Sequence, residues 1–139
     1  MKKVVFLLLT FVLLSLVFVG CDTKVYHWEF EQPYANVEEI QIIQYDTNNN
    51  YEVVKELNVS LAETIFSEIE NIDYNRYGWN LASTSEPCFL IIFSNGEYDI
   101  ISEKEPSHFR KDENGELNGY NSWLECKNNQ FDDLIKKYL

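Results

Sequence analysis

One segment, residues 89–101, constrains the fold of this chain more than any other. Asn95-Gly96 at its centre predicts a two-residue type I′ turn, because both central positions of that turn need a positive φ. A two-residue loop fixes the strand register. The register predicts one apolar face made of Phe89, Ile91, Phe93, Tyr98 and Ile100, and a smaller one made of Leu90, Ile92 and Ile101. A hairpin that is apolar on both faces belongs in the middle of a sheet.

A second hairpin and a helix precede this central hairpin. Residues 37–45 and 51–57 have strand-like patterns on either side of turn residues at 46–50. Ser60, followed three residues later by Glu63, predicts a capping box at the start of a helix. The apolar stripe of that helix is Leu61, Ala62, Ile65, Phe66, Ile69 and Ile72.

The remaining elements complete an α+β pattern. Residues 103–111 are polar and broken by Pro106, and residues 117–126 predict a last strand. Asn128 can cap a final helix. The apolar stripe of that helix is Phe131, Leu134, Ile135, Tyr138 and Leu139. Residues 37–139 are therefore expected to form one α+β domain, an antiparallel meander sheet with two helices packed on one face.

The N-terminus has the features of an export signal. Two lysines precede an apolar run over residues 4–19, and a glycine and Cys21 close it. Residues 18–21, Phe-Val-Gly-Cys, resemble the lipobox of bacterial lipoproteins, in which the cysteine receives a diacylglyceryl group and becomes the mature N-terminus. The resemblance implies that residues 1–20 are a signal peptide and that Cys21 carries the lipid. An ordinary secretory signal with a chance cysteine is the alternative.

A lipid on Cys21 would hold the chain at the extracytoplasmic face of a cell membrane. A pair of acyl chains, such as palmitate, exceeds the threshold for stable attachment without a membrane-spanning helix. Residues 21–36 then form either a tether or a first strand. Tyr26, Trp28 and Phe30 alternate with polar residues, which favours a strand docked on the domain over rings placed at the lipid headgroups.

The charge of the chain limits its partners. The sequence has 23 acidic and 11 basic residues, and a mature chain without Lys2 and Lys3 would have 9 basic residues and a formal charge of −14. Nucleic acid is excluded as a partner, because a phosphate backbone requires a basic face. A basic protein or peptide is favoured, although acidity by itself also keeps a tethered domain in solution.

One cluster has the composition of a binding site. Tyr74, Arg76, Tyr77 and Trp79 gather around a glycine, and aromatic rings beside an arginine are typical of binding hot spots. The alternative is that these rings fill the edge of the core.

Cys88 and Cys126 are an even pair in an exported domain, which permits a disulfide. Two buried thiols are an equally good interpretation. Neither cysteine lies in a Cys-x-x-Cys motif, so a redox enzyme is not expected.

Few residues suit catalysis or metal binding. The only histidines, His27 and His108, are expected at the surface, and neither a nucleophile elbow nor a phosphate-binding glycine loop is present. Residues 114–125 match an EF-hand loop only loosely, and a turn between strands is expected there. No cofactor or metal is expected.

These observations predict a lipid-anchored, extracytoplasmic, non-enzymatic module that binds a protein or peptide near the membrane. An inhibitor or immunity-type role against a cationic envelope enzyme or toxin is a sharper version of the same expectation. A cell-envelope hydrolase with a carboxylate pair is the enzymatic alternative, and a cleft holding two carboxylates, one with a raised pKa, would support it.

Overall fold

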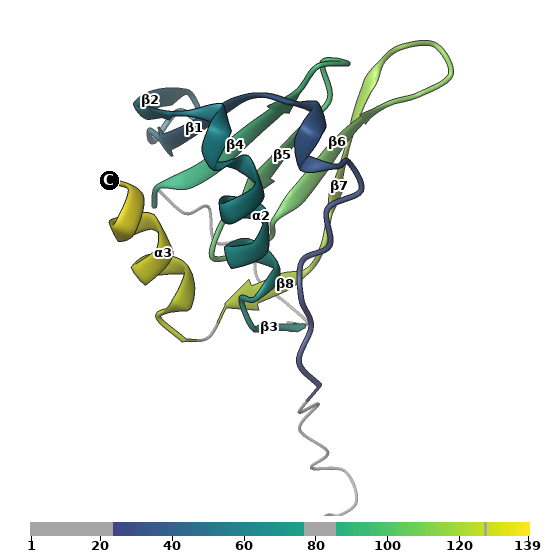
Figure 1. Ribbon diagram of the computed structural model, residues 1–139. Coiled ribbons are helices and arrows are strands. Elements are labelled where there is room, and N and C mark those ends of the chain that lie inside the picture. Colours follow the sequence, from purple (N-terminus) through teal and green to yellow (C-terminus); the bar gives the residue numbers. More distant parts are fainter. Residues whose placement is uncertain (1–23, 77–85, 127) are drawn as a thin grey trace, which may run out of the picture.

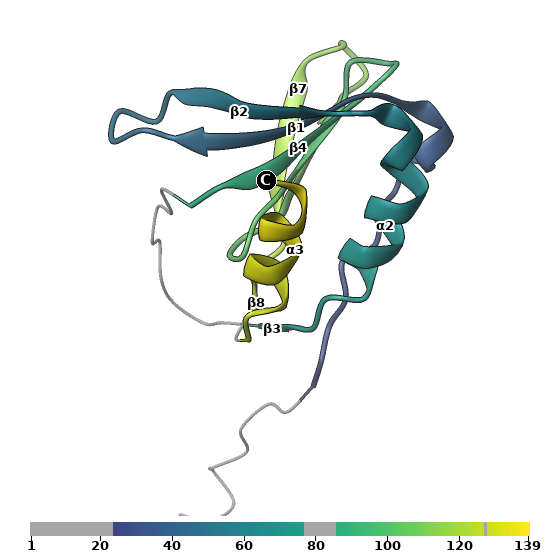
Figure 2. The same cartoon turned by 60° about the vertical axis from the view of Figure 1, so that its left-hand side comes forward.

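The computed structural model describes residues 24–76, 86–126 and 128–139 as a six-stranded antiparallel sheet with two α-helices on one of its faces (Figures 1 and 2). The strand order is β2-β1-β4-β5-β6-β7. Its strands are β1 (Val37–Tyr45), β2 (Tyr51–Leu57), β4 (Cys88–Phe93), β5 (Tyr98–Ile101), β6 (Ser107–Lys111) and β7 (Leu117–Asn121). The helices are α2 (Ala62–Glu70) and α3 (Gln130–Tyr138), with short 3₁₀ turns η1 (Tyr34–Asn36) and η2 (Val59–Leu61). The α+β prediction is confirmed.

A small second sheet lies at one end of the domain. It pairs β3 (Tyr74–Arg76) with β8 (Leu124–Cys126). The single strand predicted over residues 117–126 is wrong, because β7 belongs to the large sheet and β8 to the small one. Trp123, between them, has a φ of 58°, a left-handed conformation that breaks the extended chain.

The loop of the central hairpin is one residue longer than predicted. The Phe93 amide donates a hydrogen bond to the Glu97 carbonyl oxygen at 2.9 Å, which leaves residues 94–96 in the loop. Gly96 has a φ of 80°, as expected for a three-residue loop built on a type I turn and a left-handed glycine. The type I′ turn predicted at Asn95-Gly96 is therefore wrong.

The longer loop exchanges the two faces of β5. Ile91 lies opposite Asp99 and not opposite Ile100. Tyr98 and Ile100 consequently lie on the face away from the helices, whereas Ile101 joins the core beneath them. A carboxylate, that of Asp99, is thus placed within the core.

The main core lies between the sheet and the two helices. Ile65 and Ile69 of α2 are fully buried against it, and each contributes about 1.5–3 kcal/mol through burial. The sheet supplies Ile40, Ile42, Phe89, Ile91, Phe93 and Ile101, and α3 supplies Phe131, Leu134, Ile135 and Tyr138. Neither helix in the described ranges is long and apolar enough to cross a membrane.

An asparagine side chain accepts a backbone amide at the start of two helical segments, η2 and α3. The Asn58 side chain accepts the Ser60 amide at 2.9 Å and begins the η2 turn, so the predicted capping box of Ser60 and Glu63 is wrong. The Asn128 side chain accepts the Gln130 amide at 3.1 Å, but the N-cap of α3 is Asn129, so the contact is made from one position before the cap and Asn128 is not the cap that the sequence predicts.

The described part of the N-terminal segment is docked on the domain. The backbones of Tyr26 and Tyr74 exchange two hydrogen bonds of 2.8 Å, but this is an isolated bridge and not a strand. Trp28 is buried, and the ring of Phe30 stacks on that of Phe66 with 3.7 Å between centroids. Residues 26–30 therefore pack on the core with the alternation that the sequence indicates.

Candidate functional site

The sheet face opposite the helices carries an apolar hollow lined by tyrosines. Its volume is about 280 Å³. Both described helices pack on the other face of the sheet. The hollow is lined by Ile43, Tyr45, Tyr51, Leu90, Ile92, Gly96, Tyr98 and Ile100. We call this set the tyrosine hollow.

The hollow has an apolar floor and an exposed rim. Ile43 and Leu90 are buried at its floor, whereas 53% of the Tyr51 surface is exposed. The rings of Tyr45 and Tyr51 meet edge to face, with 6.0 Å between centroids. Rigid, half-exposed aromatic side chains above an aliphatic floor are typical of protein and peptide binding surfaces.

A neighbouring pair of rings extends this surface towards β7. The rings of Tyr98 and Phe109 stack, with 4.4 Å between centroids and 12° between planes. Phe109 covers Gly119 of the next strand, where an added Cβ would lie 2.7 Å from the Phe109 ring. Gly119 therefore provides the space that this ring occupies.

Two tyrosines of the hollow, Tyr45 and Tyr98, are weaker acids than an ordinary tyrosine. Burial raises the pKa of Tyr45 to about 12, and the nearby Cys88, Tyr98 and Tyr51 groups raise it further. Burial also raises the pKa of Tyr98, with a smaller contribution from Tyr51. Neutral phenols can donate and accept hydrogen bonds, so the rim offers a ligand both kinds of contact.

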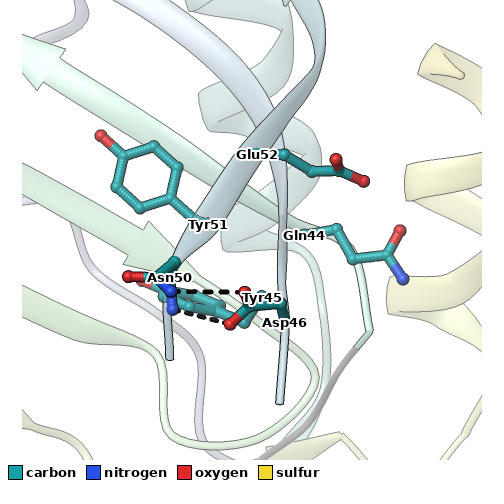
Figure 3. Close-up of a pocket in the computed structure, with 6 residues that line it drawn as sticks. All are labelled: Gln44, Tyr45, Asp46, Asn50, Tyr51 and Glu52. Atoms are coloured by element: carbon teal, nitrogen blue, oxygen red, sulfur yellow. Dashed lines mark hydrogen bonds between the residues drawn. The ribbon is translucent and has the colours of Figure 1, made fainter. Parts of the chain in front are cut away.

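A second hollow, of about 290 Å³, adjoins the first at the end of the β1–β2 hairpin (Figure 3). Tyr45 and Tyr51 line both hollows. Figure 3 shows Tyr51 pointing to one side of the hairpin and Gln44 and Glu52 to the other. Asp46 accepts the Asn48 and Asn50 amides at 2.8 and 2.9 Å, and these hydrogen bonds hold the pKa of its carboxyl below the usual range.

The predicted hot spot is only partly within the described residues. Tyr74 is fully buried and its hydroxyl donates to the Ser102 carbonyl oxygen at 3.3 Å, so its prediction as a surface binding residue is wrong. Arg76 is exposed, and its guanidinium lies 5.1 Å from the centre of the Tyr26 ring. Tyr77 and Trp79 lie outside the described residues, as does Cys21.

The two described cysteines are free thiols. Cys126 is buried in the core beneath the helices, and Cys88 in the cluster on the opposite face. The structure therefore has no disulfide between them and agrees with the alternative of two buried thiols. Burial raises the pKa of Cys88 to about 12, which makes this thiol unreactive.

A buried charged network lies on the helix-covered face, where the sequence indicated none. Asp99 is fully buried, and its Oδ1 lies 2.8 Å from Arg110 Nη1 and 3.0 Å from His108 Nδ1. The Trp28 ring packs on the His108 ring with 4.1 Å between centroids. The prediction of His108 as a surface residue is wrong, since only 16% of its side chain is exposed; His27, at 50%, is a surface residue.

This network joins the N-terminal segment to the sheet. Arg110 Nε donates to Glu31 Oε2 at 3.0 Å, and the Gln32 side chain donates to Glu97 at 2.8 Å. Burial on its own would lower the pKa of Arg110, but the carboxylates of Asp99 and Glu31 outweigh it and the pKa is raised. The guanidinium is therefore permanently charged. Glu31 and Gln32 line a hollow of about 460 Å³ beside α2, whereas Asp99, His108 and Arg110 line neither hollow described above. The contacts of these three residues join strands β5 and β6 to the N-terminal segment, which indicates a structural role.

A carboxyl pair lies beside a further hollow of about 400 Å³, which α3 borders. The pKa of Glu103 is raised to about 7, first by a hydrogen bond with the Glu86 carboxyl and then by burial and the charge of Glu86. The Glu103 carboxyl therefore keeps its proton to a higher pH than an ordinary glutamate. A cleft that holds two carboxylates, one with a raised pKa, is the feature expected of the hydrolase alternative.

Metal ligands do not gather in the described ranges: no group of three or more His, Cys, Asp or Glu residues there could hold an ion. The turn expected within residues 114–125 is present. Gly115 donates its amide to the Asp112 carbonyl oxygen at 3.0 Å, and the Asp112 side chain accepts the Asn114 and Glu116 amides.

Comparisons with protein-family models, with curated proteins and with solved structures find no match to this chain.

Arg110→Ala should destabilise the fold strongly. The substitution leaves the Asp99 carboxylate buried without its main partner, and breaking a buried pair in this way costs about 3–5 kcal/mol. Urea unfolding, followed by tyrosine and tryptophan fluorescence, measures the loss. The matched control is Arg76→Ala, which removes an exposed arginine and should cost less than about 1 kcal/mol. Equal losses for the two variants would contradict a central role of the network.

Glu103→Gln should change how stability depends on pH. A glutamate with a raised folded-state pKa binds protons more tightly when folded, so stability falls as pH rises from about 4.5 to about 7 and is level above that range. The free energy of unfolding of the variant should not fall over this pH range. Solvent screening limits the fall in the wild-type protein to about 1 kcal/mol. Unfolding free energies at pH 5 and pH 8 test it, with Glu116→Gln, in an exposed turn, as the control. A pH dependence unchanged by Glu103→Gln would refute the raised pKa of Glu103.

Proposed function

We propose that this chain is a lipid-anchored, extracytoplasmic binding module, and that it binds a protein or peptide through the tyrosine hollow. The observation that carries the proposal is a sheet face with an aliphatic floor and half-exposed tyrosines on the side away from both helices. Tyrosine offers a large contact area at a low entropic cost and is enriched at binding hot spots.

The anchor is proposed from the sequence of residues 18–21, with Cys21 as the lipidated residue. Lys24 is the first described residue and follows Cys21 by only three positions. Three extended residues span about 10 Å, so a lipid on Cys21 would hold the folded domain directly above the membrane surface. This short connection favours a partner in the cell envelope.

Binding is favoured over catalysis by the geometry of the carboxyl pair. Because Glu86 is the main cause of the raised pKa of Glu103, the two carboxyl groups must lie close together. Glycosidases hold their two carboxyl groups about 5–9.5 Å apart, with room for a sugar or a water between them. A cell-envelope hydrolase that uses this pair is the second candidate function, supported by the raised pKa of Glu103 and the adjacent hollow.

Cys21→Ala should abolish lipid attachment. When the full-length chain is produced in a bacterial host supplied with radiolabelled palmitate, the wild-type protein should carry label and fractionate with membranes. The variant has no thiol at this position to accept the diacylglyceryl group and should carry no label. Cys88→Ala is the control, because it removes a buried thiol inside the domain and should leave labelling unchanged. Label on Cys21→Ala would contradict the anchor.

Tyr51→Ala should weaken partner binding at least 30-fold. A hot-spot tyrosine contributes about 2 kcal/mol or more, and Tyr51 is exposed enough for its removal to leave the fold intact. The anchored protein is crosslinked in the membranes of its native cell, and the amount of captured partner is compared with that of Tyr120→Ala. Tyr120 is an equally exposed tyrosine in β7, outside the hollow. Equal capture by both variants would refute the tyrosine hollow as the binding site.

A further inference from the structure

The strand β2 is an open edge of the sheet. It is the outermost strand beside β1, and every residue from Tyr51 to Glu56 is exposed (Figures 1 and 2). Within the described residues no strand pairs with its outer side. An edge strand of this kind presents a row of backbone donors and acceptors to which an extended peptide can add as a further strand.

Hollows lie at both ends of this edge. The tyrosine hollow and the hollow in Figure 3 share Tyr45 and Tyr51 at one end. A third hollow of about 310 Å³ lies at the other end, where Glu56, Leu57 and Val59 contribute to its lining. Seven extended residues span about 23 Å. An added strand of that length would thus have space for alternate side chains at both ends.

The charges along the edge select the partner. Glu38, Glu39, Glu52 and Glu56 lie on β1 and β2, and none of them forms an ion pair with a described cation. Lys55, the hairpin's own cation, is directed to the Leu139 carbonyl oxygen at 2.9 Å. A second copy of this acidic chain would bring like charges together, whereas a basic strand would neutralise them.

We infer that an extended basic peptide segment adds as a strand to the outer edge of β2 and packs alternate apolar side chains against Tyr51, at the margin of the tyrosine hollow. The inference deepens the proposed function and rests on it. Val54 is an extra residue between the pairs Ile43–Val53 and Ile42–Lys55, so the edge consists of two short straight stretches on either side of a bulge.

The first test uses a fluorescein-labelled twelve-residue peptide of alternating lysine and valine and the full-length protein in a non-ionic detergent. Fluorescence anisotropy gives the affinity at low salt. The double variant Glu52→Lys/Glu56→Lys should bind at least tenfold more weakly. Glu113→Lys/Glu116→Lys makes the same change in net charge at the exposed β6–β7 turn and should change the affinity less than twofold. Equal effects of both double variants would show non-specific attraction and overturn the inference.

The second test removes the backbone donors of the peptide. The same peptide, N-methylated at every second residue, keeps its charge but cannot complete a strand ladder, and it should bind at least tenfold more weakly. Unchanged binding, or no binding of the unmodified peptide, overturns strand addition. If strand addition fails but capture of the native partner still depends on Tyr51, the tyrosine hollow remains the binding site and only the proposed strand addition is wrong. If the peptide binds β2 but native capture is independent of Tyr51, the proposed function fails instead.

Discussion

The contact between Asp99 and Arg110 is the interaction on which the rest of this fold depends. A fully buried carboxylate is strongly unfavourable unless it is paired. Here Oδ1 lies 2.8 Å from Arg110 Nη1 and 3.0 Å from His108 Nδ1, and Oδ2 has no hydrogen-bond partner among the described residues. Through Glu31 the same arginine also holds the N-terminal segment. One guanidinium thus joins β5, β6 and the chain that leads to the proposed anchor.

This arrangement divides the sheet into two faces with different properties. On the face that contains the network, α2, α3 and Trp28 complete the core, and the described polar groups there serve packing. The opposite face keeps a smaller cluster around Ile43 and Leu90 with tyrosines at its margin. Stability is thus concentrated on one side of the sheet, which leaves the other side free to vary its side chains for recognition.

Hydrophobic periodicity was sufficient to predict the α+β class, the two helices and the strands β1, β2, β4 and β5. It did not predict the polar network, because a loop longer by one residue exchanges the faces of β5 and places Asp99 inside. His108 and Arg110 were missed for a related reason. Both lie on β6, two positions apart and therefore on the same face. The polar residues of β6 and the adjacent Pro106 did not indicate a strand there. Tyr98 was predicted on the wrong face of the sheet. Tyr45 and Tyr51 lie side by side because β1 and β2 pair at these residues, and the sequence pattern alone does not give that pairing.

The position of the N-terminal segment has a consequence for orientation. Both views show that the described chain starts at the end of the domain remote from β2 (Figures 1 and 2). A globular domain of about this length is roughly 35 Å across. If Cys21 is embedded in a bilayer, the free sheet edge stands at about that height and points away from the lipid. Lateral diffusion would then move the outward-facing edge parallel to the membrane surface. The chain would meet envelope proteins by diffusion in two dimensions instead of three.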